Sequence, residues 1–229
     1  MSTSVVFEER VEVPVSSIGS LAEFRRWAQS DGFPESGRID YLSGRIEVDM
    51  SPEDFFCHGT LKTEIVGVLH QLVKRGDLGY LLTDRTRVSC PEADLSVEPD
   101  VVFVSHGALD TGRVVLVPGA SREPGRYVEV EGPPDLVVEI VSDSSVTKDT
   151  RRLPEAYFQA GVREFWLADA RKEPAVFAVH RRAGKGFEAV RPDAEGHQAS
   201  RLFGVSFQLA SRRDPRGHWA FDLRVREDR

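Results

Sequence analysis

Two acidic residues lie in apolar, strand-like segments, where a carboxylate is unusual. Glu139 lies in the apolar run LVVEIV (residues 136–141), and Asp100 stands at the mouth of another apolar strand, in VEPDVVFV (residues 97–104). Burying a carboxylate in such a strand is costly unless it is paired or bound to a cation. If the two strands are neighbours, both acids can hold one hard divalent cation such as Mg²⁺. Such a cation activates a water molecule and neutralises charge that builds on a phosphate, so the pattern indicates phosphoryl chemistry.

A basic group to stabilise developing charge is available shortly after Glu139. Lys148 follows it by nine positions, at the start of the next predicted helix, and Arg151 and Arg152 come next. Taken singly, each residue has an ordinary interpretation: Asp100 as a turn or cap residue, Lys148 as a solvated lysine, Glu139 as half of a structural salt bridge. Taken together, two acids on core strands followed by a basic helix start favour a site.

Strand and helix patterns alternate along the chain, which predicts the α/β class. Helices are expected over 20–28, opened by the capping box Ser20–Glu23, over 61–72 with an end near Gly76, and over 153–160 before Gly161. Strands are expected at 38–48 (a hairpin turning at Ser43-Gly44), 78–82, 85–90, 97–104, 114–117, 136–141, 165–167, 176–179, 203–209 and 219–225. Residues 105–134 hold many glycines and prolines and are expected to be a long loop around the short strand 114–117. The run 136–141 is expected to be a central strand buried on both faces.

Length and composition restrict the class of protein. The 229 residues are expected to form a single domain, and the 40% hydrophobic and 29% charged residues exclude a disordered chain. No apolar run is long enough to span a membrane, and the N-terminus lacks a signal-peptide pattern, so a cytoplasmic protein is expected. Two cysteines, Cys57 and Cys90, are too few for a disulfide framework. The net charge of −7 argues against tight passive binding of nucleic acid and does not exclude an enzyme.

An ordered series of motifs resembles a known family. The series is Gly44 in the hairpin, Met50-Ser51-Pro52, His58 before a helix, Glu98-Pro99-Asp100, PDLVVEIVS (134–142) and YFQAGVREFWLAD (157–169). It is similar to the Uma-type family of restriction endonucleases, within the PD-(D/E)xK nuclease superfamily, over about residues 20–190. The resemblance implies a restriction-endonuclease-like core, with a mixed β-sheet flanked by helices, and a β-rich extension over 191–229.

The resemblance also implies roles for particular residues. Asp100 matches the superfamily's first acid and Glu139 its second, and both would bind the metal. The superfamily's lysine should fall two positions after the second acid, where this chain has Val141, so Lys148 becomes the candidate with Arg152 behind it. His58 matches a position where the family often has histidine, and either helps to place metal or substrate or caps the helix. Three further acids, Glu64, Asp40 and Glu47, are weaker candidates.

These inferences predict an endonuclease that hydrolyses DNA phosphodiesters with Mg²⁺ or Mn²⁺. By analogy with nucleases that cut both strands, a homodimer is expected. Two alternatives remain open at the level of sequence. One is a binding or scaffold module that kept the fold and lost the chemistry, which Val141 and the acidic balance favour. The other is a hydrolase of small phosphorylated molecules, which suits the negative charge.

Overall fold

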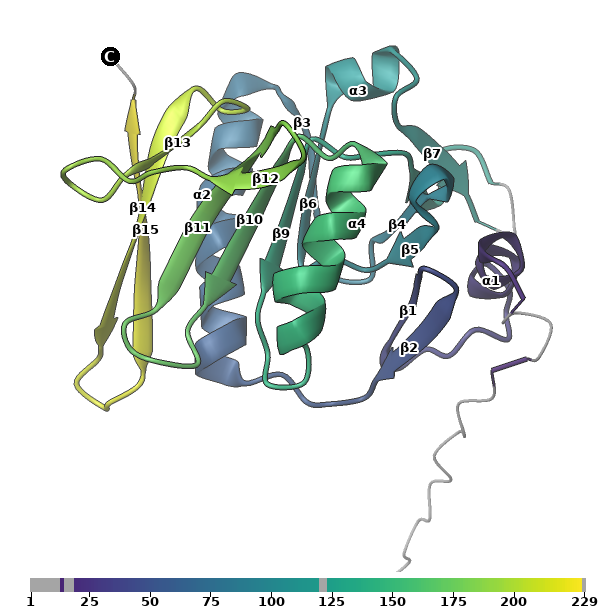
Figure 1. The fold of residues 1–229 in the computed structure, drawn as a ribbon, viewed down its shortest axis with the longest axis horizontal. Coiled ribbons are helices and arrows are strands. Elements are labelled where there is room, and N and C mark those ends of the chain that lie inside the picture. Colours follow the sequence, from purple (N-terminus) through teal and green to yellow (C-terminus); the bar gives the residue numbers. More distant parts are fainter. Residues whose placement is uncertain (1–12, 15–18, 120–122, 228–229) are drawn as a thin grey trace, which may run out of the picture.

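The computed structural model describes residues 13–14, 19–119 and 123–227 (Figure 1). The first twelve residues, on which the prediction of no signal peptide rests, lie outside the described residues. Within the described ranges, no helix is both long and apolar enough to cross a membrane.

The central sheet has six strands and carries the apolar run that contains Glu139. Its order is β12 (Gly186–Ala189), β11 (Val176–Ala183), β10 (Glu164–Asp169), β9 (Leu136–Ile140), β6 (Val101–Ser105) and β3 (Gly79–Thr83). Strand β9 pairs in parallel with β10 and antiparallel with β6, and all five of its residues are buried. The prediction of a central strand buried on both faces is therefore confirmed.

A second six-stranded sheet contains the predicted hairpin. Its order is β2 (Arg45–Asp49), β1 (Arg38–Leu42), β5 (Leu95–Val97), β4 (Arg87–Cys90), β8 (Tyr127–Glu131) and β7 (Val115–Pro118). Ser43 and Gly44 both have positive φ, 50° and 76°, as the tight turn of a two-residue hairpin requires. The strand predicted over 97–104 is in fact two, because the chain leaves β5 at Val97 and enters β6 of the other sheet at Val101.

The prediction for residues 105–134 was right about the strand at 114–117, which is β7, and wrong in making the rest a long loop. This stretch contains helix α3 (His106–Asp110) and strands β7 and β8. Strand β8 pairs in parallel with β4, where Arg87 lies opposite Glu129, and β7 pairs with β8. These strands form because a distant edge supplies their hydrogen bonds, which the local glycine and proline content does not reveal.

Helices and a third sheet cover the two faces of the central sheet. Helix α4 (Leu153–Ala160) packs in a core shared by both six-stranded sheets, and α2 (Thr60–Gly76) packs on the opposite face. Beside α2 lies the three-stranded sheet β13 (Gln198–Ser200), β14 (Val205–Arg213) and β15 (Trp219–Glu227), at the left of Figure 1. Helix α1 (Leu21–Ala28) covers β1, and its Ser20 cap accepts the Glu23 N–H as predicted. The short helical segments are η2 (Phe55–Gly59), η3 (Pro91–Ala93) and η4 (Lys148–Arg152).

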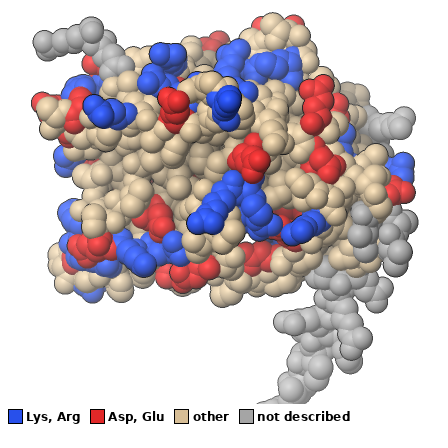
Figure 2. Space-filling view, viewed as in Figure 1, with Lys and Arg blue, Asp and Glu red and all other residues tan. Residues whose placement is uncertain are grey.

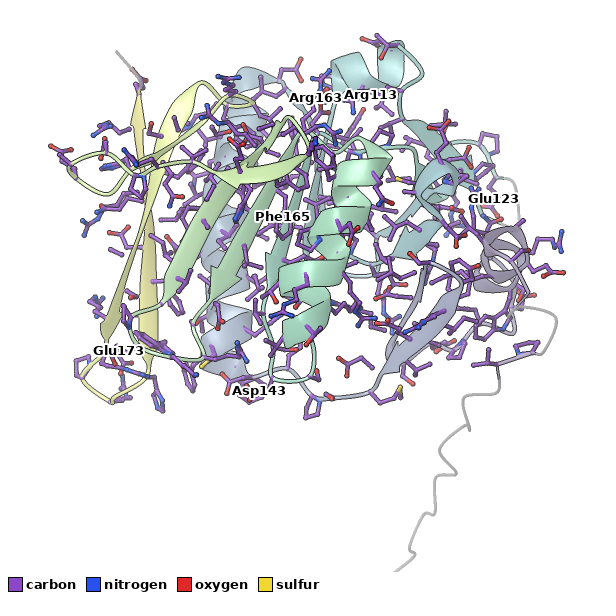
Figure 3. All side chains as sticks on the ribbon, in the orientation of Figure 1. Arg113, Glu123, Asp143, Arg163, Phe165 and Glu173 are labelled. Carbon is purple, nitrogen blue, oxygen red and sulfur yellow. The ribbon has the colours of Figure 1, made fainter. Side chains whose placement is uncertain are left out.

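The two ends of β9 differ in character. Before the strand, Asp135 binds Arg113 at 2.5 Å and Arg163 at 3.1 Å, and Figure 3 shows these arginines together at the top. After the strand, the chain turns through Asp143, which lies at the bottom of the same view. The first end is closed by ion pairs, and the second leads to the candidate site.

Candidate active site

Asp100 is the most constrained acid of the site. The residue is fully buried directly before β6, where its Oδ2 accepts the Ile140 N–H of β9 at 2.8 Å and its Oδ1 accepts a hydrogen bond from Arg38 at 2.8 Å. Burial would raise its pKa, but the hydrogen bond from His58 and the positive charges of Arg38 and Lys62 hold the pKa well below its usual range. Asp100 is therefore a carboxylate at neutral pH.

Glu139 lies on the neighbouring strand and has the opposite electrostatics. The β6–β9 register pairs Val101 with Val138, so Asp100 and Glu139 occupy adjoining positions on the two strands. Glu139 Oε1 accepts the Tyr157 hydroxyl at 2.5 Å, and Oε2 has no hydrogen-bond partner among the described residues. Burial, followed by the charges of Asp100 and Asp149, raises the pKa of Glu139 well above its usual value. Two acids whose pKa values diverge in this way are typical of a shared catalytic site.

His58 lies against Asp100 and does not cap the helix. Its Nε2 is 3.5 Å from Asp100 Oδ2, and its Nδ1 is 3.2 Å from Glu53 Oε2. The capping role belongs to Asp54, whose Oδ1 accepts the Phe56 N–H at 2.8 Å. Burial would lower the pKa of His58, but the hydrogen bond and charge of Asp100 outweigh burial and raise it. Ligand atoms of Glu53, His58 and Asp100 lie within 4.8 Å of one another, close enough to hold a metal ion.

Lys148 points into the protein from η4. It is 8% exposed, and its ammonium pairs with Asp40, whose other carboxylate oxygen accepts the Glu98 N–H at 2.9 Å. The charge of Asp40 and, more weakly, that of Glu139 raise the pKa of Lys148 against the effect of burial. Lys148 is thus within electrostatic reach of Glu139, while its direct partner is Asp40. Val141, at the superfamily's lysine position, is buried and donates its N–H to Ala168 in the sheet.

The weaker acidic candidates have other partners. Glu64 Oε1 accepts the Leu223 N–H at 2.8 Å and so joins α2 to β15, away from the acids. Glu47 pairs with Arg152 across the space between β2 and η4. Asp40 belongs to the site through its bond to Lys148.

Several site residues were missed by the sequence analysis. Arg38 opens β1 and binds Asp100, and Lys62 lies one helical turn after His58, with its ammonium 3.8 Å from Asp100 Oδ1. The four-residue spacing of His58 and Lys62 was a usable signal, because such residues share one face of a helix. Arg38 had no comparable signal, since only the pairing of β1 brings it to Asp100. Asp149 was also missed: it is buried, its Oδ1 has no partner among the described residues, and burial raises its pKa to about 6.

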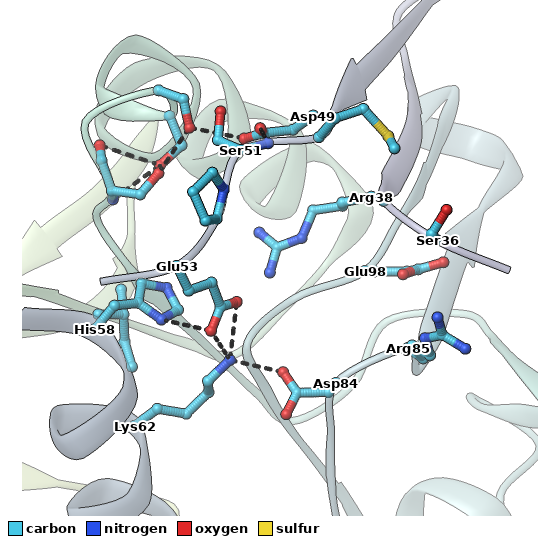
Figure 4. A pocket seen from close by; sticks show the side chains of 17 residues that line it. Ser36, Arg38, Asp49, Ser51, Glu53, His58, Lys62, Asp84, Arg85 and Glu98 are labelled. Atoms are coloured by element: carbon cyan, nitrogen blue, oxygen red, sulfur yellow. Dashed lines mark hydrogen bonds and ion pairs between the residues drawn. The ribbon is translucent and has the colours of Figure 1, made fainter. Parts of the chain in front are cut away.

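A polar pocket of about 460 Å³ opens above these residues (Figure 4). Its wall includes His58 and seven charged side chains: Arg38, Lys62, Arg85, Asp49, Glu53, Asp84 and Glu98. The four acids outnumber the three bases, and Asp100 is a further buried negative charge beneath them. A second cavity of about 490 Å³ adjoins the pocket and is lined by Lys148 and Arg152. A phosphate in this pocket would therefore face charges of both signs.

The donor set of this site fits a hard divalent cation. Asp100 is a buried carboxylate, and Glu139 carries a buried oxygen without a partner. Burial raises the pKa of Glu139 most, and the negative charges of Asp100 and Asp149 raise it further. A cation between Asp100 and Glu139 would offset that repulsion. Carboxylate oxygens are the ligands that Mg²⁺ and Mn²⁺ prefer.

One face of the molecule carries both signs of charge. On the face shown in Figure 2, Lys and Arg side chains are interspersed with Asp and Glu side chains. Such a surface gives less sequence-independent affinity for nucleic acid than a continuous basic face would.

A mixed sheet flanked by helices, with acids where two central strands adjoin, defines a restriction-endonuclease-like α/β protein. The chain belongs to the Uma2 family, described as "Putative restriction endonuclease", whose model matches residues 21–211. Among solved structures it is similar to a protein from Anabaena variabilis described as "a putative nuclease belonging to DUF820". The two share 21% identity with a TM-score of 0.55, over 80% of this chain and 90% of that one, which confirms the predicted fold class. A search of curated proteins found no significant match.

Proposed function

We propose that this protein is a metal-dependent endonuclease that hydrolyses phosphodiester bonds in DNA. The observation that carries the proposal is the pair of fully buried acids, Asp100 and Glu139, on adjoining strands beneath a polar pocket. We further propose that residues 1–229 act as one domain. The contact of Glu64 in α2 with β15 supports this, because it ties the C-terminal strands to the core.

Each site residue has a role that its contacts support. Asp100 and Glu139 would hold Mg²⁺ or Mn²⁺, which when bound activates water and neutralises charge on the phosphate. Arg38 and His58 orient Asp100 through its two oxygens, and Tyr157 orients Glu139. Lys148 adds positive charge near Glu139, which favours the ionised form of that acid. The same charge stabilises the negative charge that develops on the phosphate in the transition state.

DNA is proposed as the substrate from the family description, and a homodimer from the need to cut two strands. Because the net charge of the chain is −7, we propose that productive binding depends on the metal-filled site more than on sequence-independent attraction to phosphates.

A module that binds without cleaving is the second candidate function. Val141 favours it, since the position of the superfamily's lysine is a buried sheet residue here. The net charge of −7 favours it as well.

Titration of Mn²⁺ by calorimetry, together with cleavage of a supercoiled plasmid, tests the proposal. Wild type should bind Mn²⁺ and cleave only with a divalent cation present. Glu139→Gln should weaken Mn²⁺ binding at least about tenfold and abolish cleavage while the protein stays folded, because the amide removes a buried charge without changing the shape. The exposed Glu155 supplies the control, and Glu155→Gln should behave as wild type.

Three results decide between the candidates. Cleavage by Glu139→Gln at the wild-type rate would make Glu139 structural. Absence of Mn²⁺ binding by wild type would exclude the metal site. Plasmid binding without cleavage under every divalent cation would establish the binding module instead.

A further inference from the structure

Besides Lys148, helix α2 carries a second lysine that could stabilise charge at the site. We propose that Lys62 is a catalytic residue whose ammonium contacts the scissile phosphate. This inference rests on the proposed phosphodiester hydrolysis and adds to it the group that meets the substrate.

Lys62 is directed into the polar pocket. It lies one helical turn after His58, and its ammonium is 2.7 Å from Asp84 Oδ1, 3.1 Å from Glu53 Oε2 and 3.8 Å from Asp100 Oδ1 (Figure 4). The residue is 8% exposed, so its four-carbon stem is packed and only its end reaches the pocket. A phosphate seated beside Asp100 would therefore meet this ammonium.

The partners of Lys62 can be exchanged for a phosphate. The side chains of Glu53 and Asp84 are 48% and 58% exposed, so water can solvate both carboxylates when the ammonium leaves them. The third contact, with Asp100, lies at the outer limit of an ion pair. Moving the ammonium onto a phosphate oxygen therefore costs little.

Lys148 is held differently. Its partner Asp40 is 1% exposed and is itself fixed by the Glu98 N–H. Lys148 lines the neighbouring cavity, whereas Lys62 lines the polar pocket together with His58. The two lysines thus serve different sides of the site: Lys148 acts on Glu139, and Lys62 acts on the phosphate.

Arg38 also lines the pocket, where its guanidinium is already oriented by the hydrogen bond that its Nη2 donates to Asp100 at 2.8 Å. A lysine ammonium is a compact point charge, and the packed stem of Lys62 holds it at the pocket, where it can contact one phosphate oxygen as the charge of that oxygen increases. Lys62 keeps its proton throughout, and no covalent bond to it forms or breaks. The Lys62 ammonium contributes most in the transition state, because the phosphate oxygen that it contacts then carries more negative charge than in the substrate.

The test compares Lys62→Ala and Lys62→Arg with wild type, using bis(p-nitrophenyl) phosphate as a small substrate with Mn²⁺. Lys62→Ala should lower kcat about 10²-fold, as loss of one charge-stabilising donor does elsewhere. Ethylammonium added to Lys62→Ala should restore part of kcat in a saturable manner, and Lys62→Arg should retain part of it. Mn²⁺ should bind Lys62→Ala at least as tightly as wild type, because a positive charge near Asp100 is removed. The matched control is Lys74→Met, an exposed lysine later on the same helix, which should leave kcat unchanged.

Binding of inorganic phosphate, followed by calorimetry, separates this inference from the proposed function. Lys62→Ala should bind phosphate at least about tenfold more weakly than wild type, whether or not the protein cleaves DNA. If wild type has no hydrolytic activity but this difference is found, the proposed function fails and the phosphate contact stands. If Lys62→Ala hydrolyses the substrate and binds phosphate as wild type does, the inference is overturned. A loss of activity without rescue and with unchanged phosphate binding would assign Lys62 a purely structural role and overturn it equally.

Discussion

Among the described residues, the hydroxyl of Tyr157 is the only hydrogen-bond partner of the Glu139 carboxyl group. Tyr157→Phe removes this donor and keeps the ring, which packs 6.0 Å from Phe165 between ring centroids. A hydrogen bond to a charged group contributes about 1.5–3 kcal/mol, and one between neutral groups about 1 kcal/mol. We therefore expect the variant to lose about 2 kcal/mol of unfolding free energy when Glu139 is ionised.

The loss should depend on pH, and its sign follows from the pKa of Glu139. Burial and the neighbouring charges of Asp100 and Asp149 raise this pKa well above its usual value, so ionisation of Glu139 costs stability as the pH rises through it. The Tyr157 hydroxyl reduces that cost, because it donates to the carboxylate. The pKa of Tyr157 is itself raised well above its usual value by burial and by Glu139, so the hydroxyl stays a donor throughout. Tyr157→Phe should accordingly be more destabilising above the raised pKa of Glu139 than below it.

Urea denaturation over a series of pH values measures this effect, with the linear dependence of free energy on urea giving the difference between variant and wild type at each pH. Tyr127→Phe, at a half-exposed tyrosine, should change stability by less than about 0.5 kcal/mol. In a Glu139→Gln background, the effect of Tyr157→Phe should no longer vary with pH. If Tyr157→Phe is as stable as wild type at every pH of the series, the hydroxyl does not support Glu139 and the electrostatic reasoning for this acid fails.

Two further predictions concern stability and use matched controls. Burial raises the pKa of Asp149 to about 6, so the ionised carboxylate lowers the unfolding free energy above that pH. Asp149→Asn should therefore stabilise the protein by about 3 kcal/mol at pH 8 and by little at pH 4, as measured by thermal unfolding. Asp143→Asn, at a 96% exposed side chain, should do neither, and an equal gain there would refute the reasoning. Gly132 has a φ of +97°, and a Cβ would lie 2.2 Å from the Arg113 carbonyl oxygen, so Gly132→Ala should cost at least about 2 kcal/mol in urea. At Gly184 nothing lies within 4 Å, and Gly184→Ala should stay within about 0.5 kcal/mol; similar losses at both positions would contradict the steric argument.

Much of the fold could be predicted because its signals are local. The run 136–141 is apolar throughout except for Glu139, so it had to be a buried strand, and β9 is one. The periodic apolar face over 61–72 predicted α2, and Ser43-Gly44 predicted the hairpin turn. Each of these features depends on side-chain period or turn conformation within a few residues.

The site could be predicted only in part, for the same reason. Asp100 and Glu139 were conspicuous because a carboxylate in an apolar strand is anomalous wherever the strand lies. Their surroundings come from strand pairing: Arg38 is 62 positions before Asp100, and Asp40 is 108 positions before its partner Lys148. No local pattern encodes such distances, just as none showed that β8 would find β4.

The sequence by itself therefore determined which residues had to be buried, which segments had to be strands or helices, and which two acids required an explanation. Only the tertiary structure decided which charges meet them. Two sheets, the segment η2 and the start of α2 bring Arg38, His58 and Lys62 to Asp100, while Tyr157 comes to Glu139 from α4. The physical reason is that the tendency of a segment to be buried and its backbone conformation follow from the residue types in that segment. The pairing of buried charges depends instead on which strands exchange hydrogen bonds.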